Sequence, residues 1–223
     1  VMPAIFEEEQ IVFDQITEKD ILLHYPFEPF DFYLAFLRQA TEDPKVVSIR
    51  HTLYRTGSDS TVVDLLAKAA MKGKEVFVVI ELRARFDEEA NIEVASKLQE
   101  AGVQVVYGIV GYKTHAKMCM VFRKERRTLR RYVHLATGNY HAGTSRLYTD
   151  YSYFTTDRDI GEDVHKLFQR IATMSKQAKL KKIEHAPFTL HPKILSLIER
   201  EASNAKKGKP AAIYAKMNAL TEP

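Results

Sequence analysis

His115 and Lys117 are separated by one residue in the segment Thr114-His115-Ala116-Lys117. The segment opens an apolar run that predicts a strand over His115–Phe122. Because side chains alternate along a strand, both residues should point to the same side. An imidazole nitrogen can attack a phosphoryl group while a nearby ammonium neutralises the phosphate oxygens. Taken alone, however, the pattern is more typical of a polar strand end in contact with solvent.

A turn of small residues, Ala136-Thr137-Gly138-Asn139-Tyr140, follows a second predicted strand over Arg131–Ala136. Gly138 allows the backbone to come close to an anion, and the amide of Asn139 can donate a hydrogen bond to it. By itself this sequence favours a simple Gly-Asn turn. Together with His115 and Lys117, it indicates a site for a phosphate group.

The elements that must position these residues are predicted from apolar periodicity. A helix over Phe30–Ala40 comes first, and an alternation of strands and helices follows it. Gly residues after each helix of this alternation are typical helix ends. The order β-α-β-α-β with short connections predicts a parallel sheet covered by helices. The strands are expected at Val46–Tyr54, Glu75–Leu82 and Val103–Tyr107, and the helices at Thr61–Lys72 before Gly73 and at Asp87–Ala101 before Gly102.

The second half of the chain has a different pattern. His115–Phe122 and Arg131–Ala136 are joined by a basic turn and predict an antiparallel pair. A strand over Tyr148–Thr155 and a helix over about Arg158–Ser175, capped by Asp157, come next. A last helix begins near His191, and Ala211–Met217 are expected to form a strand.

Composition excludes several classes of protein. The 223 residues are 45% hydrophobic, which is enough for a packed core. The net charge of +4 is too small to indicate nucleic acid by itself. Cys119 is the single cysteine, so an internal disulfide and a cysteine-based zinc site are excluded. On strand alternation Cys119 faces the same side as His115, but a small buried strand residue is the simpler interpretation.

Several blocks, in this order, resemble bacterial polyphosphate kinases of the histidine-phosphorylating type. The long block Glu81–Asn91 is the most specific of them, and the blocks span most of the chain. The His-x-Lys and Gly-Asn pair alone is similar to half of a phospholipase D site. The blocks are Leu22–Pro26, Tyr54-Arg55, Glu81–Asn91, Lys113–Lys117, Thr137–Tyr140 and Leu147–Tyr151.

The resemblance implies an α/β fold, namely a phospholipase D-like mixed sheet flanked by helices. Residues 1–25 are expected to be a leading segment from a preceding region, and residues 26–183 the catalytic domain. Residues 184–223 are expected to be the incomplete beginning of a second, similar domain. The family site combines two half-sites, and the second histidine and a further nucleotide-binding Arg are expected outside this chain. We therefore expect poor turnover from these residues alone.

The resemblance also implies the chemistry. ATP would transfer its terminal phosphate to His115 and then reversibly to polyphosphate, with Mg²⁺ accompanying the nucleotide. Lys117 and Asn139 would act on the transferred group, and Tyr148 would contact ATP. The family assigns Arg55 and Arg85 to a magnesium site; a permanently charged Arg cannot ligate a cation, so contacts to phosphate are expected instead.

The expected partners are ATP or ADP and inorganic polyphosphate, and no nucleic acid. The full-length protein is expected to be a cytoplasmic homo-oligomer, with membrane association left open. Asp150 is two residues from Tyr148 and is expected either to orient His115 or to accept a hydrogen bond from an Arg.

Two rival hypotheses remain open. A phosphodiesterase or nuclease of the phospholipase D type would also use His115, but the Asp that usually follows the His-x-Lys pair is missing, and Arg123 and Lys124 are the charges nearby. A basic binding module would instead use a cluster such as Arg123–Arg131. That cluster is more typical of a solvated hairpin tip.

Overall fold

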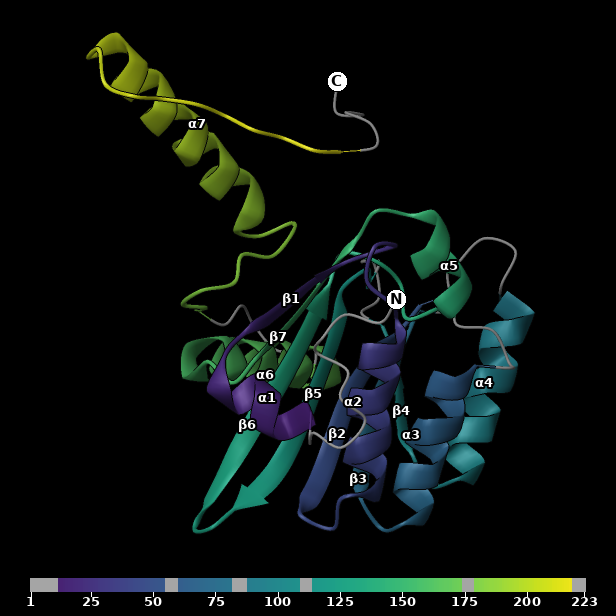
Figure 1. The fold of residues 1–223 in the computed structure, drawn as a ribbon. Coiled ribbons are helices and arrows are strands. Elements are labelled where there is room, and N and C mark those ends of the chain that lie inside the picture. Colours follow the sequence, from purple (N-terminus) through teal and green to yellow (C-terminus); the bar gives the residue numbers. More distant parts are fainter. Residues whose placement is uncertain (1–11, 55–59, 82–87, 109–113, 174–178, 218–223) are drawn as a thin grey trace. The chain divides into compact units, whose positions relative to one another are not determined.

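The computed structural model describes residues 12–54, 60–81, 88–108, 114–173 and 179–217 (Figure 1). The chain divides into two compact units, residues 1–181 and residues 182–223. The first unit holds the predicted site.

The first unit is built on a seven-stranded mixed sheet in the order β1-β7-β6-β5-β2-β3-β4. β2, β3 and β4 are parallel, and every other neighbouring pair is antiparallel. The strands are β1 (Ile21–His24), β2 (Val46–Leu53), β3 (Glu75–Ile80), β4 (Gln104–Tyr107), β5 (Lys117–Glu125), β6 (Thr128–Ala136) and β7 (Tyr151–Thr155). This arrangement confirms the predicted α/β fold with a mixed sheet.

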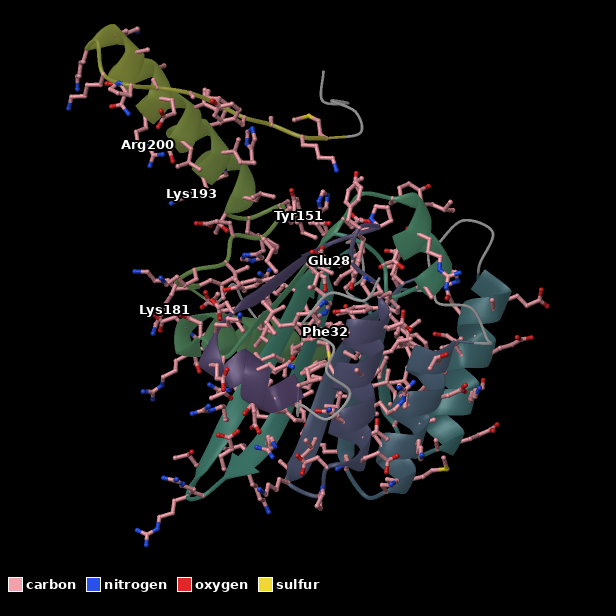
Figure 2. All side chains as sticks on the ribbon, viewed as in Figure 1. Glu28, Phe32, Tyr151, Lys181, Lys193 and Arg200 are labelled. Carbon is pink, nitrogen blue, oxygen red and sulfur yellow. The ribbon has the colours of Figure 1, made fainter. Side chains whose placement is uncertain are left out.

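Helices cover both faces of the sheet. α1 (Val12–Glu18), α2 (Asp31–Glu42), α3 (Thr61–Met71) and α4 (Glu88–Glu100) lie on one face, and α6 (Arg158–Thr173) packs on β5 and β6 from the other (Figure 1). The main core lies under the first group, where Phe32 of α2 meets Phe154 of β7 with ring centroids 5.0 Å apart (Phe32 is labelled in Figure 2). On the other face, Phe77 of β3 packs against Phe168 of α6.

The predicted β-α-β-α-β unit is confirmed. α3 and α4 are followed by Gly73 and Gly102, whose φ angles are +82° and +88°. These left-handed conformations end the helices, as predicted from the glycines. Asp157 caps α6 through its carboxylate, which accepts a hydrogen bond of 2.8 Å from the backbone N–H of Ile160.

The antiparallel pair is also confirmed, although its strands are longer at the basic turn than predicted. β5 begins at Lys117 rather than at His115 and runs to Glu125. β6 begins at Thr128, and Arg126 in the turn has a φ of 50°. His115 therefore lies just before the strand.

Two elements at the start of the chain were not predicted. α1 packs on α2, and β1 pairs with β7 at the edge of the sheet. Both are short, so they have too few residues to produce a clear hydrophobic period. The predicted limits of the leading segment and of the two domains stay predictions.

The strand predicted over Tyr148–Thr155 starts too early. A short helix, α5 (Ala142–Leu147), occupies the chain before it, and the N–H of Tyr148 bonds to the carbonyl of Thr144. His141 caps this helix through Nδ1, which accepts a hydrogen bond of 3.1 Å from Thr144 N. Histidine is not a usual cap, so the sequence lacked the common signal.

The second unit contains α7 (Leu190–Lys206), which confirms the last predicted helix. The strand predicted over Ala211–Met217 is wrong, because these residues have no regular secondary structure. A strand needs a partner for its backbone hydrogen bonds, and the part of this unit that the structure describes has no other strand. Across the described ranges of both units, none of the helices has the length and apolar character needed to cross a membrane.

Candidate active site

Among the described residues, the predicted His115, Lys117 and Asn139 belong to one end of the sheet. Lys117 at the start of β5 pairs with Ala136 at the end of β6. His115, just before β5, and Asn139, just after β6, therefore adjoin neighbouring strand ends. β2 and β3 reach the same end with their carboxyl ends, at Tyr54 and Glu81. Ligands of open α/β sheets bind at this end of the sheet.

Lys117 is buried, with only 5% of its surface exposed. Its Nζ donates a hydrogen bond of 2.7 Å to the carbonyl of His115 and lies 5.0 Å from the ring centroid of Tyr54. A cation over an aromatic face is held by the quadrupole of the ring. The ammonium is therefore fixed beside the histidine.

His115 is exposed to solvent. Its ring meets Tyr54 in a T-shaped contact, with centroids 5.1 Å apart and an interplanar angle of 77°. Tyr54 itself is buried. Both side chains therefore contact the same ring, whereas the predicted strand alternation does not extend to His115, which precedes β5.

The segment before His115 is anchored to the end of β3. The carboxylate of Glu81, which is 4% exposed, accepts a hydrogen bond of 2.6 Å from the backbone N–H of Thr114. The carbonyl of Glu81 accepts a further bond of 3.2 Å from Nδ2 of buried Asn91 on α4. Neither residue has a role predicted from the sequence beyond membership of the Glu81–Asn91 block.

A clamp between Thr137 and Asp150 holds the turn that contains Asn139. The Thr137 hydroxyl donates to Oδ1 of Asp150 at 2.7 Å and accepts from the N–H of Tyr151 at 2.9 Å (Tyr151 is labelled in Figure 2). A Cβ at Gly138 would lie 2.4 Å from Oδ2 of Asp150, so the close approach of this carboxylate requires glycine. Among the described residues, Thr137 is thus the side chain that donates a hydrogen bond to the Asp150 carboxylate.

Behind the turn lies a network of buried polar side chains that sequence analysis did not find. His134 on β6 bonds through Nδ1 to the hydroxyl of Tyr140 at 2.9 Å and through Nε2 to Ser152 at 2.6 Å. Tyr140 directly follows Asn139, so the network ties the turn to β6 and β7. Alternating apolar residues around His134 gave no signal that it would be buried with polar partners.

A second buried histidine, His51, lies on β2 and contacts Tyr33 and Tyr140. Its Nδ1 is 2.8 Å from the carbonyl of Thr52, and a carbonyl only accepts, so Nδ1 carries the proton. Nε2 therefore accepts a hydrogen bond from the hydroxyl of Tyr33. The His51 ring also packs 4.3 Å from that of Tyr140.

Burial controls the charge of these groups. It lowers the pKa of His51 to about 3, with the bond to the Thr52 carbonyl acting weakly in the opposite direction. Burial, with His51 nearby, holds the pKa of His134 well below its ordinary value. Both imidazoles are neutral near pH 7. Burial also raises the pKa of the fully buried Cys119 thiol to about 12, which agrees with a small core residue.

Tyr148, Arg55 and Arg85 are the remaining predicted site residues, and the structure describes only Tyr148. Tyr148 follows α5 directly and exposes 53% of its surface, so its ring is accessible to a ligand. Arg55 and Arg85 lie outside the described residues. The described residues contain no group of three or more His, Cys, Asp or Glu side chains that could hold a metal.

The seven-stranded mixed sheet flanked by helices has a phospholipase D-like fold. The phospholipase D family member Nuc from Salmonella typhimurium has the same fold, with a TM-score of 0.56 at 15% identity, over 72% of this chain and 98% of its own.

The chain belongs to the polyphosphate kinase family. The model of the polyphosphate kinase C-terminal domain 1 matches residues 11–177. The polyphosphate kinase of Xylella fastidiosa is 57% identical over 99% of this chain, and that of Pseudomonas aeruginosa is 53% identical over 100%. The chain spans 32% of the length of each. The crystal structure of the Porphyromonas gingivalis polyphosphate kinase matches 93% of this chain and 35% of its own, with a TM-score of 0.82 and 32% identity.

Proposed function

We propose that this chain carries the phosphate-transfer half-site of a polyphosphate kinase, with His115 as the phosphorylated residue. Exposed His115 beside the buried ammonium of Lys117 is the observation that supports this best. The curated relatives, which are named polyphosphate kinases, support the same conclusion.

The proposed reaction has two steps. A ring nitrogen of His115 forms a bond to the terminal phosphorus of ATP, while the bond from that phosphorus to the bridging oxygen breaks and ADP leaves with the electron pair. In the second step a terminal oxygen of polyphosphate attacks the same phosphorus, and the bond to nitrogen breaks. Both steps are reversible, and most of the catalysis is positioning and charge stabilisation.

The residues of the site have distinct proposed roles. Lys117 stabilises charge on the transferred phosphoryl group, and the amide of Asn139 donates to one of its oxygens. Tyr148 contacts the nucleotide. Arg55 and Arg85 bind phosphate oxygens. Mg²⁺ bound to the nucleotide would screen the charge of its phosphates.

We further propose that robust turnover needs a second half-site outside these 223 residues. The chain's match to about a third of each relative supports this. The full-length protein is here the longest natural protein that contains these 223 residues. Polyphosphate synthesis by the 223 residues alone at a rate near that of the full-length protein would contradict the need for a second half-site.

Radiolabelled ATP tests the central proposal. The full-length protein should acquire an acid-labile label on histidine, and His115→Ala should abolish it. His191→Ala, a matched change at an exposed histidine of α7, should retain the label. A binding module would show salt-dependent affinity for polyphosphate but no label. A phosphodiesterase would cleave a diester substrate and take no phosphate from ATP.

A further inference from the structure

We propose that Glu81 is a positioning residue for His115, and that its carboxylate acts by holding the backbone of Thr114. This inference rests on the proposed role of His115. Glu81 directly follows β3 and lies 34 positions before His115 in the sequence. Its side chain does not need to touch substrate.

Glu81 is well placed to act as a rigid anchor. Its N–H donates to the carbonyl of Leu53 at 3.3 Å, which extends the pairing of β2 with β3 by one residue. Its own carbonyl is held by Asn91. With the backbone fixed on both sides and the side chain buried, the carboxylate has little freedom to move. Oε2 therefore presents a fixed acceptor to the N–H of Thr114.

Gly108 makes room for this contact. Its N–H donates to the carbonyl of Ile80 at 3.3 Å, so it extends the β4 edge beside Glu81. A Cβ at this position would lie 2.6 Å from Oγ1 of Thr114 and 3.3 Å from Oε2 of Glu81. Oγ1 of Thr114 thus approaches the backbone of Gly108 more closely than a Cβ would allow, and Oε2 of Glu81 comes close to that limit.

The contact between Glu81 and Thr114 has a counterpart on the other side of His115. Lys117 bonds to the His115 carbonyl, and Glu81 bonds to the Thr114 N–H. The backbone torsions of Thr114 and His115 all lie between these two tethers. The Tyr54 ring then meets the imidazole itself. The orientation of the attacking nitrogen follows from these three contacts, of which Glu81 supplies the one that precedes the histidine.

Three variants in the full-length protein test this. Glu81→Gln keeps an oxygen acceptor of the same shape, and we expect histidine labelling within about threefold of the wild type. Glu81→Ala removes the acceptor and should slow labelling at saturating ATP by roughly 10- to 100-fold, the scale expected for a displaced reacting group. The KM for ATP should change little, because the binding groups remain. Gly108→Ala should reproduce the loss by displacing Thr114.

Glu100→Gln, at an exposed position near the end of α4, is the matched control and should label like the wild type. Thermal unfolding of each variant identifies those that fold. Labelling of folded Glu81→Ala at the wild-type rate would overturn the inference. An equal loss in Glu81→Gln and Glu81→Ala would also overturn it, because the charge rather than the acceptor would then matter.

If Glu81→Ala does not fold, the inference depends on Glu81→Gln and Gly108→Ala. It then stands only if the first labels normally and the second labels slowly. Absence of label on the wild-type protein would instead refute the proposed function, and the inference with it.

Discussion

The two buried histidines should make the protein sensitive to mild acid. His51 and His134 are neutral inside the core, and each is hydrogen-bonded in its neutral form. In the unfolded chain each imidazole has its ordinary pKa of about 6.5. When the pH falls from about 7.5 to about 5.5, the unfolded state binds protons that the folded state does not. The stability of the folded state must therefore decrease in this window.

The size of the effect follows from the pKa values. His51 has a folded pKa of about 3, so it stays unprotonated down to about pH 4. A group of this kind with an unfolded pKa of about 6.5 contributes a loss of about 1.4 kcal/mol by pH 5.5. His134, whose pKa burial also holds well below its ordinary value, acts in the same direction, so the total loss should exceed that of His51 alone. A loss of this size is measurable against the roughly 5–15 kcal/mol that stabilises a typical domain.

Urea unfolding at the two pH values measures this loss. The near-ultraviolet circular dichroism of the buried tyrosines, Tyr33, Tyr132 and Tyr140, follows the core of the first unit, since the chain has no Trp. Few carboxylates titrate in this window, so histidines dominate the change. His134→Gln should reduce the pH dependence, because it removes one of the two buried imidazoles. A loss below about 1 kcal/mol for the wild-type chain would refute the assignment of two buried neutral imidazoles.

Three further predictions concern single residues. Lys117→Met should change the unfolding free energy by less than about 1.5 kcal/mol, because Met fills a similar buried volume, yet label on His115 should fall sharply; equal labelling would contradict the role of the ammonium. Gly138→Ala should destabilise the fold by about 1–3 kcal/mol in urea, because its Cβ displaces Asp150; an unchanged midpoint would argue against the Thr137–Asp150 clamp. The Cys119 thiol should resist a thiol-reactive dye near pH 8 until urea unfolds the chain, because it is fully buried with a pKa of about 12; rapid labelling of the folded protein would show that the thiol is accessible.

The parallel half of the fold could be predicted because its signals are local. β3 is a nearly continuous apolar run, and Gly73 and Gly102 mark the ends of α3 and α4. These features depend on residues close in sequence, and the backbone conformation of glycine does not need a distant partner. The same is true of Asp157, whose capping contact spans three residues.

Several elements could not be predicted for the opposite reason. β1 has four residues, and it exists as a strand because β7, far away in sequence, offers its backbone. The apolar pattern of Ala211–Met217 was similar, yet without a partner strand among the described residues of its unit it forms none. Strand formation depends on pairing, and pairing is a property of the whole fold.

The residues of the candidate site divide in the same way. Their types and order identified the family and placed His115, Lys117 and Asn139 near one another, because an antiparallel pair with a short turn leaves few alternatives. Only the tertiary structure showed that Tyr54 contacts both His115 and Lys117, that Glu81 holds Thr114, and that His134 is a buried structural residue. These contacts join separate strands, and their energies depend on burial and exact distance, which the order of residues along the chain does not specify.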